Sequence, residues 1–389
     1  MILIIIFWVS VFALIHSYIV YPTLIGFLAR TRPGNITIFK PTEELPDVTV
    51  LMAVHNEEDV IHEKLNSIFA NTLPVGKLNI LIGSDASTDK TNVLLEELSL
   101  SNENLTYIKF SSRIGKSAVI NELVRLSGSE ILIITDANVI LGDNTIYHLI
   151  KHFKNPEVGL VDSNMKHKGL KNNGISVQEN AYISREVRIK YNEGKLWGTM
   201  MGPFGGCYAI RRKLYSNVPD LFLVDDFYIN MKVIKANFKA IMEPEALVFE
   251  DVSNSLIEEF RRKIRIAAGN FQNLGHFSGC LFSNIPGLSF SYFSHKVLRW
   301  MGPFFLSAIF LSTVFLRHEK NIYSYLFVIQ LIILILPIID YLLGKIKIHI
   351  IILRFITHFL SMNCALLVGF IKYLKGVKSN VWQPTRRNQ

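Results

Sequence analysis

The sequence contains little cysteine, and its first 29 residues contain no charged side chain. Cys207, Cys280 and Cys364 lie far apart without the spacing of metal ligands, which argues against a zinc site and for a reducing compartment without disulfides. A secretory signal peptide would begin with basic residues and carry a shorter apolar region, and Met1–Ala29 does neither. The stretch is long enough to span a bilayer, so we predict an uncleaved anchor.

Two common nucleotide-binding motifs are also missing. Gly115-Lys116-Ser117 resembles the end of a P-loop, but that motif needs glycine where Phe110 stands, and no strand is followed by the spaced glycines of a dinucleotide fold. These absences disfavour a P-loop ATPase and a simple dehydrogenase. Basic and aromatic residues are not interleaved in the soluble part, so the net charge of +9 favours membrane lipids and an anionic small substrate over nucleic acid.

Hydrophobic residues make up 50% of the chain and gather in long runs, which indicates a membrane protein. Arg30, Arg32 and Lys40 follow the first run, and the positive-inside rule places the next domain in the cytoplasm. One span before the domain and three after it would put the basic tail outside, unless one apolar segment is re-entrant or residues 276–296 enter the bilayer. We expect an anchor at 1–29, a soluble domain at 45–255, amphipathic interfacial helices at 256–296, about three spans at 297–374 (apolar runs near 301–316, 322–343 and 350–371), and a basic tail at 375–389.

Apolar strands alternate with helical segments in the first half of the soluble domain. The expected strands are 47–54, 78–82, 105–110 and 130–138, and this repeated alternation predicts a doubly wound parallel sheet. Polar residues follow the strand ends at Glu57, Asp85, Lys116 and Asp136. Because the carboxyl ends of parallel strands meet at one edge, we predict a nucleotide-binding crevice there. For Asp136 the alternative is a residue that only caps a turn.

The second half of the soluble domain adds three features. A strand at 158–163 and a polar helix at 175–190 precede the glycine-rich run 198–206, which can let a ligand approach the backbone or form a flexible loop. Asp225 and Asp226 follow an apolar segment, where one can cap a helix and the other can keep a raised proton affinity as a general base. On the amphipathic helix 256–272, Arg262 and Arg265 face the same way, toward anionic lipid or a diphosphate.

These residues, taken in order, resemble the motifs of membrane-integrated family 2 glycosyltransferases, the group of bacterial poly-N-acetylglucosamine, cellulose and hyaluronan synthases. The resemblance covers residues 45–275 in detail. It implies a GT-A type α/β fold, a doubly wound and mostly parallel sheet flanked by transmembrane helices. The matching segments are His55-Asn56-Glu57-Glu58, Ser84-Asp85-Ala86-Ser87-Thr88-Asp89, Arg113-Ile114-Gly115-Lys116, Thr135-Asp136-Ala137-Asn138, Val224-Asp225-Asp226, Arg262-Lys263-Ile264-Arg265-Ile266 and Trp382-Gln383-Pro384-Thr385-Arg386.

The resemblance implies a role for each matching residue. Asp226 is the catalytic base, and Asp136 with Asn138 holds Mg²⁺ or Mn²⁺ through the family's D-x-D motif, whose second acid is an amide here. Asp85 accepts the uracil N3 proton. The remaining nucleotide-sugar residues are His55, Glu57, Lys116, Arg262 and Arg265, and the acceptor-side residues are Gly205, Gly206, Asp225 and Trp382. Arginine and isoleucine replace the glutamine and tryptophan of Q-x-x-R-W at 262 and 266, which weakens the inference of a processive polymerase.

The implied function is that of an inverting hexosyl- or N-acetylhexosaminyltransferase that moves a sugar from a UDP-sugar to a hydroxyl in exopolysaccharide or cell-envelope glycan synthesis. Transfer of a single sugar to a lipid-linked acceptor is the alternative within the enzyme class. A more distant alternative is a transporter or receptor with a regulatory nucleotide domain. Such a protein would need ionisable residues paired inside the spans. We expect a multi-pass protein of the inner membrane with a cytoplasmic catalytic domain, a glycan or lipid-linked acceptor, and an accessory export subunit as a further partner.

Overall fold

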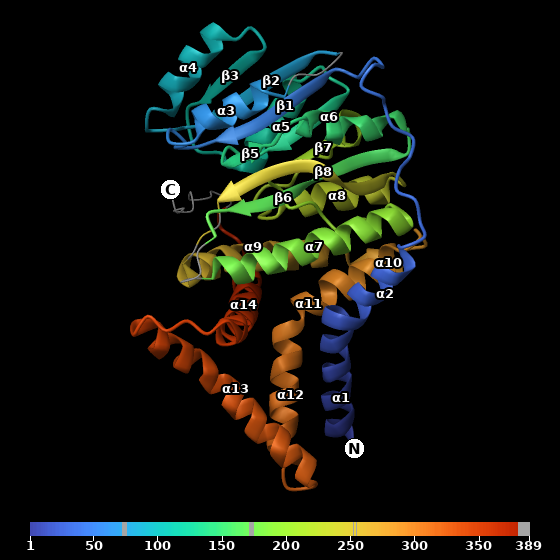
Figure 1. The fold of residues 1–389 in the computed structure, drawn as a ribbon, viewed down its shortest axis with the longest axis vertical. Helices are drawn as coiled ribbons and strands as arrows, with labels where there is room; N and C mark the ends of the chain where they lie inside the picture. The colour runs from blue at the N-terminus through green and yellow to red at the C-terminus, as the bar shows by residue number, and fades with distance from the viewer. Residues whose placement is uncertain (72–75, 171–174, 252, 254, 380–389) are drawn as a thin grey trace.

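The computed structural model describes residues 1–71, 76–170, 175–251, 253 and 255–379. Figure 1 shows an α/β domain at one end of the molecule and long apolar helices at the other. Two helices, α7 (Ser176–Trp197) and α9 (Leu256–His276), lie between these parts. Any ligand held at the lower edge of the sheet therefore lies close to the apolar helices.

One sheet of eight strands organises the domain within the described residues, in the order β3-β2-β1-β4-β7-β6-β8-β5. β1 pairs in parallel with β2 and β4, and β2 pairs in parallel with β3. β7 runs antiparallel to β4 and β6, β6 is parallel to β8, and β5 is antiparallel to β8. The mostly parallel α/β fold predicted from the sequence is confirmed. The strands are β1 (Val48–Val54), β2 (Leu78–Asp85), β3 (Leu105–Phe110), β4 (Ile131–Thr135), β5 (Val139–Leu141), β6 (Val158–Lys168), β7 (Cys207–Arg211) and β8 (Lys239–Asp251).

The core lies on both faces of this sheet, because alternate side chains of a strand point to opposite faces. In β1, Val50 and Met52 pack on the face covered by α3 (Ile61–Phe69), α4 (Thr91–Ser101) and α6 (Thr145–Ile150), whereas Leu51 and Ala53 pack on the face of α5 (Lys116–Leu126) and α8 (Asp225–Lys235). All seven residues of β1 are buried. Burial on both faces explains why the strand is an uninterrupted apolar run.

The apolar helices form the other end of the molecule. The first span, Ile2–Leu28, consists of α1 (Ile2–Ile15), a π-helical turn and α2 (Tyr21–Leu28), and α1 packs along α12 (Gly302–Leu316). Among the described residues, three helices are long and apolar enough to cross a membrane, and a fourth crossing arises if Leu288–Trp300 and α12, bent by 60°, form one broken span. Besides the first span, the helices that are long and apolar enough to cross are α13 (Asn321–Lys345) and α14 (Ile351–Leu374). Short segments complete the chain: η1 (His16–Val20), η2 (Lys151–Lys154), η3 (Arg212–Leu214), η4 (Ser278–Phe282), α10 (Leu288–Ser291), η5 (Tyr292–Val297) and α11 (Leu298–Trp300).

The last helix, α14, packs mainly along the amphipathic helix α9. A Cβ at Gly369 would lie 2.4 Å from the Cβ of Ala267, so the two helices touch closely. Near the end of α14, the Phe370 ring meets Phe271 of α9 at 4.9 Å. The C-terminal end of α14 therefore lies beside the domain, as Figure 1 shows.

Candidate active site

A cavity of about 1650 Å³ is lined by residues that follow the strand ends and by residues of α7, α9 and the apolar helices. The structure brings most of the predicted site residues to its wall. They are Glu57, Lys116, Asp136, Asn138, Gly205, Asp225, Asp226, Arg262 and Arg265. Three others, His55, Asp85 and Gly206, lie behind the wall, and Trp382 lies outside the described residues.

Asp85 is the predicted residue farthest from its expected role. Its carboxylate is fully buried and accepts hydrogen bonds from the backbone N–H groups of Ile114 (2.7 Å) and Gly115 (3.1 Å) and from Arg113 Nε (3.2 Å). His55 Nδ1 bonds the Asp85 backbone oxygen at 2.8 Å. In this structure Asp85 fixes the loop that begins α5, and its contact with a base stays a prediction.

The loop held by Asp85 delivers Lys116 to the cavity. Gly115 has φ +87°, a conformation that residues with side chains rarely adopt, and α5 starts at the next residue. Lys116 Nζ lies 2.6 Å from Asp136 Oδ1. Burial favours the neutral amine, but the carboxylates of Asp136, Asp225 and Asp226 outweigh it and raise the pKa of Lys116. The lysine stays charged and available to a phosphate.

The turn after β4 presents Asp136 and Asn138 to the cavity, and two contacts hold it from behind. Asp136 N–H donates to Gly206 O at 3.0 Å, so Gly206 supports the turn through its backbone. Lys64, with no exposed surface, donates to Thr135 Oγ1 at 2.8 Å and to Val139 O. Burial lowers the pKa of Lys64 to about 8.

Lys64 was not singled out from the sequence, although a signal was present. It follows Ile61 by three residues and precedes Leu65 and Ile68, so it occupies a position on the apolar face of α3. A lysine at such a position is costly to bury unless its ammonium has partners. The turn that carries Asp136 supplies them.

The residues of this turn suit a divalent cation that is shared with phosphates. No group of three His, Cys, Asp or Glu side chains that could hold a metal alone occurs in the described part of the chain. Magnesium-type ions commonly take one or two protein oxygens and complete their shell with water and substrate phosphate oxygens. The Asp136 carboxylate and the Asn138 amide, two residues apart and both at the cavity, fit that pattern.

Asp226 lies across the cavity at the start of α8. Its Oδ1 accepts the backbone N–H of Phe227 at 2.7 Å. Burial, and then the charge of Asp225, raise the pKa of Asp226 to about 7, against the opposing effect of Lys116. A carboxylate with this pKa can take a proton from a hydroxyl near neutral pH.

Gly205 explains part of the glycine-rich run. Its φ is +78°, and a Cβ there would lie 2.6 Å from Asp226 Oδ2. Any side chain at this position would collide with the carboxylate. The glycine therefore lets the backbone pass against Asp226 and leaves room beside it.

The basic motif on α9 lines another part of the cavity. Lys263 pairs with the buried Glu179 at 3.0 Å and with Glu259 at 3.4 Å, and Arg262 Nη1 lies 3.5 Å from Glu259. Arg265 lines the cavity without an ion pair or hydrogen bond to any residue that the structure describes. Burial and the neighbouring Arg262 lower the pKa of Arg265 more than the carboxylates of Asp225, Asp136 and Asp226 raise it, so the charge of this arginine is only partly compensated. An anionic ligand would provide a further counter-charge.

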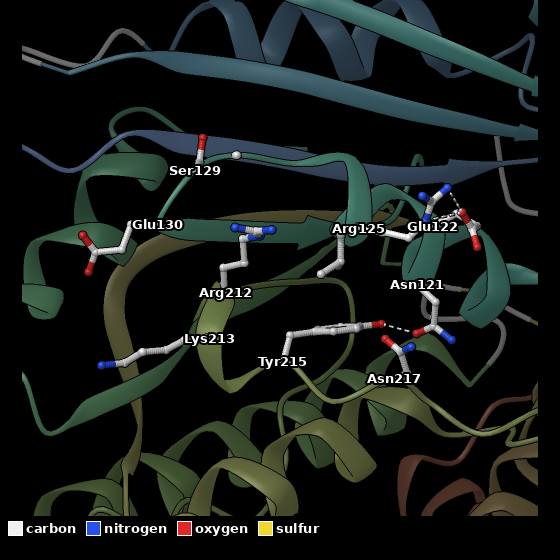
Figure 2. Close-up of a pocket in the computed structure, with 11 residues that line it drawn as sticks. Asn121, Glu122, Arg125, Ser129, Glu130, Arg212, Lys213, Tyr215 and Asn217 are labelled. Atoms are coloured by element: carbon white, nitrogen blue, oxygen red, sulfur yellow. Dashed lines mark hydrogen bonds and ion pairs between the residues drawn. The ribbon is translucent and has the colours of Figure 1, made fainter.

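A second cavity of about 600 Å³ lies at the opposite end of β4. Figure 2 shows its side chains, among them Tyr215, whose hydroxyl donates to Asn121 Oδ1 at 2.7 Å, and Arg125, which is paired with Glu122. None of the predicted site residues lines this cavity. The larger cavity is therefore the candidate active site.

Comparison with known proteins gives a consistent result. The model of glycosyl transferase family 2 matches residues 49–218. Poly-beta-1,6-N-acetyl-D-glucosamine synthases are similar: that of Staphylococcus epidermidis is 22% identical over 66% of this chain and 63% of its own length. The Staphylococcus aureus (strain MSSA476) protein is 24% identical over 60% and 56%. The chain thus spans less than two thirds of the length of these relatives.

A solved structure shares the fold over nearly the whole chain. It is the mannosyltransferase PcManGT from Pyrobaculum calidifontis in complex with GDP-Man and Mn²⁺, with a TM-score of 0.71 and 21% identity. The match covers 95% of this chain and 99% of that one. The apolar helices therefore belong to the shared architecture together with the α/β domain.

Proposed function

Because the model of glycosyl transferase family 2 matches residues 49–218, we propose that the chain is an inverting glycosyltransferase that moves a sugar from a nucleoside diphosphate to a hydroxyl at the membrane. One observation carries the proposal. Asp226, with its pKa raised to about 7, and the Lys116–Asp136 pair line the same cavity. This arrangement joins a base for the acceptor to a charge cluster for the donor.

The base acts on the acceptor. Asp226 takes the proton of the acceptor hydroxyl as that oxygen attacks the anomeric carbon from the face opposite the diphosphate. The new C–O bond forms while the bond between the anomeric carbon and the diphosphate oxygen breaks, and the diphosphate leaves with the electron pair. Proton removal of this kind contributes about a hundred- to ten-thousand-fold to the rate.

The cations act on the leaving group. Lys116 and Arg265 line the donor side of the cavity and neutralise the charge that develops on the diphosphate. Arg262 adds charge from one turn earlier on α9. A Mg²⁺ or Mn²⁺ held by Asp136 and Asn138 would add further charge stabilisation, and the uncharged amide of Asn138 should make its binding weaker than that of a pair of acids.

A UDP-sugar is the proposed donor, on the basis of the motifs at His55, Glu57 and Asp85. The neighbour from Pyrobaculum is in complex with GDP-Man, so the test of the donor includes both UDP- and GDP-sugars. The acceptor is proposed to be a growing glycan, which the similarity to poly-beta-1,6-N-acetyl-D-glucosamine synthases supports. The loss of the motif tryptophan at Ile266 favours the second candidate, addition of one sugar to a lipid-linked acceptor.

The membrane placement belongs to the same proposal. We place the α/β domain in the cytoplasm, where nucleotide sugars are made, with Arg30 and Arg32 at the cytoplasmic end of the first span. The close packing of α14 on α9 supports a C-terminal tail on the same side. An accessory export subunit would then meet the apolar helices.

A donor panel tests this function. Purified full-length protein is incubated with UDP- and GDP-sugars, with and without Mn²⁺ or Mg²⁺, and release of the nucleoside diphosphate is measured. We expect release from one or a few UDP-sugars, faster with the metal than with a chelator. Release from GDP-sugars alone would reject uracil as the nucleobase of the donor. Release from none of the nucleotide sugars would reject the proposed function.

A further inference from the structure

The active-site cavity extends well beyond the charge cluster that faces the donor. Typical small-molecule sites occupy roughly 300 to 1,000 Å³, whereas this cavity measures about 1650 Å³. Its far part is lined by Tyr18 of η1, Arg185 and Glu186 of α7, and Arg299 of α11. This part lies where the domain meets the apolar helices.

The far part contains more positive than negative charge. Glu186 is buried, and its carboxylate accepts hydrogen bonds from His295 Nε2 (3.0 Å), Lys296 Nζ (3.1 Å) and Arg299 Nη1. Arg185, the preceding residue, lines the cavity and has no ion pair or hydrogen bond to any residue in the described part of the chain.

Arg185 also lies in an unfavourable field. Burial and the nearby charge of Arg299 lower its pKa more than the carboxylate of Glu186 raises it. Glu186 pairs with Arg299 through Nη1, whereas Arg299 Nε has no hydrogen-bond partner among the described residues. A second anion beside Arg185 and Arg299 would reduce the repulsion that remains between the two guanidinium groups. A phosphate, with its acceptor oxygens, is the ligand that arginine pairs bind best.

The part of α14 that lines the cavity is mainly apolar. Phe355, Phe359 and Met362 of α14 line the cavity, and the Tyr18 ring meets Phe359 at 5.6 Å. These residues belong to helices whose outer surfaces are exposed and apolar. A ligand that fits both the arginines and these apolar residues has an anionic head and a hydrocarbon chain that can enter between the apolar helices.

We propose that the far part of the cavity binds the phosphate of a lipid-linked acceptor, through Arg185 and Arg299, with its hydrocarbon chain against α14. The proposal rests on the proposed function and names the acceptor class. The lipid phosphate is not altered in the reaction. It fixes the acceptor so that a hydroxyl of its sugar loses a proton to Asp226 while that oxygen forms the new bond.

A binding experiment tests the site without knowledge of the acceptor sugar. Binding of farnesyl phosphate, farnesol and inorganic phosphate to the purified full-length protein is measured by calorimetry with saturating UDP and GDP, which occupy the donor end. We expect farnesyl phosphate to bind at least tenfold more tightly than either farnesol or inorganic phosphate. Equal affinity for farnesol and farnesyl phosphate, or binding of inorganic phosphate alone, would overturn the proposal.

Two arginines of one helix provide the matched variants. Arg185→Gln should weaken farnesyl phosphate binding about tenfold, the loss expected for one charged hydrogen bond. Arg188→Gln removes the same charge from a side chain that is exposed like Arg185 but does not line the cavity, and should leave the affinity unchanged. Equal effects of the two variants would reduce the site to general charge attraction and overturn the assignment of Arg185.

The outcomes separate this inference from the function on which it rests. If donor turnover is observed but farnesyl phosphate binds no better than farnesol, the acceptor is a free glycan and only the inference fails. If no nucleotide sugar is turned over, both fail. The thermal unfolding temperature of Arg185→Gln should match that of the wild type, because this side chain has no partner among the described residues to lose.

Discussion

At the residue scale, the proton affinity of Asp226 sets the pH dependence of the reaction. Its pKa is raised to about 7, so the carboxylate becomes protonated as the pH falls through that value. A protonated Asp226 cannot accept the hydroxyl proton. We expect kcat to fall about tenfold per pH unit below the pKa and to level off above it. A profile that stays flat down to pH 5 would contradict the assignment.

The same carboxylate should reduce the stability of the fold. Its pKa is higher in the folded protein than in the unfolded chain, so folding favours the protonated form, and this stabilising effect is lost as the pH rises through about 7. Asp226→Asn removes the charge and keeps the shape. We expect this variant to unfold at a higher temperature than the wild type above pH 7, with a smaller difference at pH 5. A lower unfolding temperature at both values would contradict the expectation.

Gly205 gives a second prediction at this scale. Gly205→Ala would place a methyl group 2.6 Å from Asp226 Oδ2 and strain a backbone with φ +78°. We expect kcat to fall at least tenfold. Gly128→Ala is the control, because a Cβ there meets nothing within 4 Å. Similar activity in the two variants would show that the space beside Asp226 is not needed.

Residues also show where sequence reasoning stops. Asp136, Asp226 and Lys116 could be located from the sequence because each follows a readable strand or loop signal. Glu186 and Glu193 could not, since a polar helix gives no sign of which charges are buried. Glu193 accepts hydrogen bonds from Tyr21, His295 and the Met201 N–H, and these partners lie up to 172 positions away.

At the element scale, α9 should serve the donor through Arg265. Arg265→Ala removes a cavity arginine that has no hydrogen bond or ion pair among the described residues, and a charged hydrogen bond to a phosphate is worth about 1.5 to 3 kcal/mol. We expect the KM for the donor to rise roughly ten- to a hundredfold. Arg125→Ala, which removes an exposed arginine paired only with Glu122, should leave the KM unchanged. An unchanged KM in Arg265→Ala would remove α9 from the donor site.

The helix α7 should hold the domain on the apolar helices. Glu186→Ala would leave His295, Lys296 and Arg299 without their shared carboxylate. Removal of one partner from a buried pair typically costs about 3 to 5 kcal/mol. We expect a clear fall in the unfolding temperature, whereas Glu122→Ala, at an exposed pair, should have little effect. Equal unfolding temperatures would mean that the network does not hold the two parts together.

The sheet illustrates which elements local pattern can predict. The sequence predicts β1–β4 because each alternates with a helix and contains several apolar residues. The strand β8 was not predicted, since Glu243, Pro244 and Glu245 interrupt its pattern and its pairing with β6 shifts register near this point. β5 has three residues and depends on β8 for its pairing.

At the scale of the whole molecule, the packing of α14 supports a basic tail on the same side of the membrane as the α/β domain. With α14 along α9, the crossings after the domain are those of the broken span that ends in α12 and of α13, and an even number places the domain and the tail on one side. We expect a single cysteine at position 320 to react with an impermeant label from the side opposite the domain, and one at position 378 from the domain side. Cys207, Cys280 and Cys364 are replaced beforehand. Labelling of both from one side would contradict this arrangement.

The central claim is that one cavity combines a donor charge cluster with Asp226 as the base. The most direct test is the rate of sugar transfer by full-length Asp226→Asn, compared with the wild type above pH 7 and at saturating donor. The account predicts a loss of about a hundred- to ten-thousand-fold with donor affinity retained. A rate within a few-fold of the wild type would contradict it.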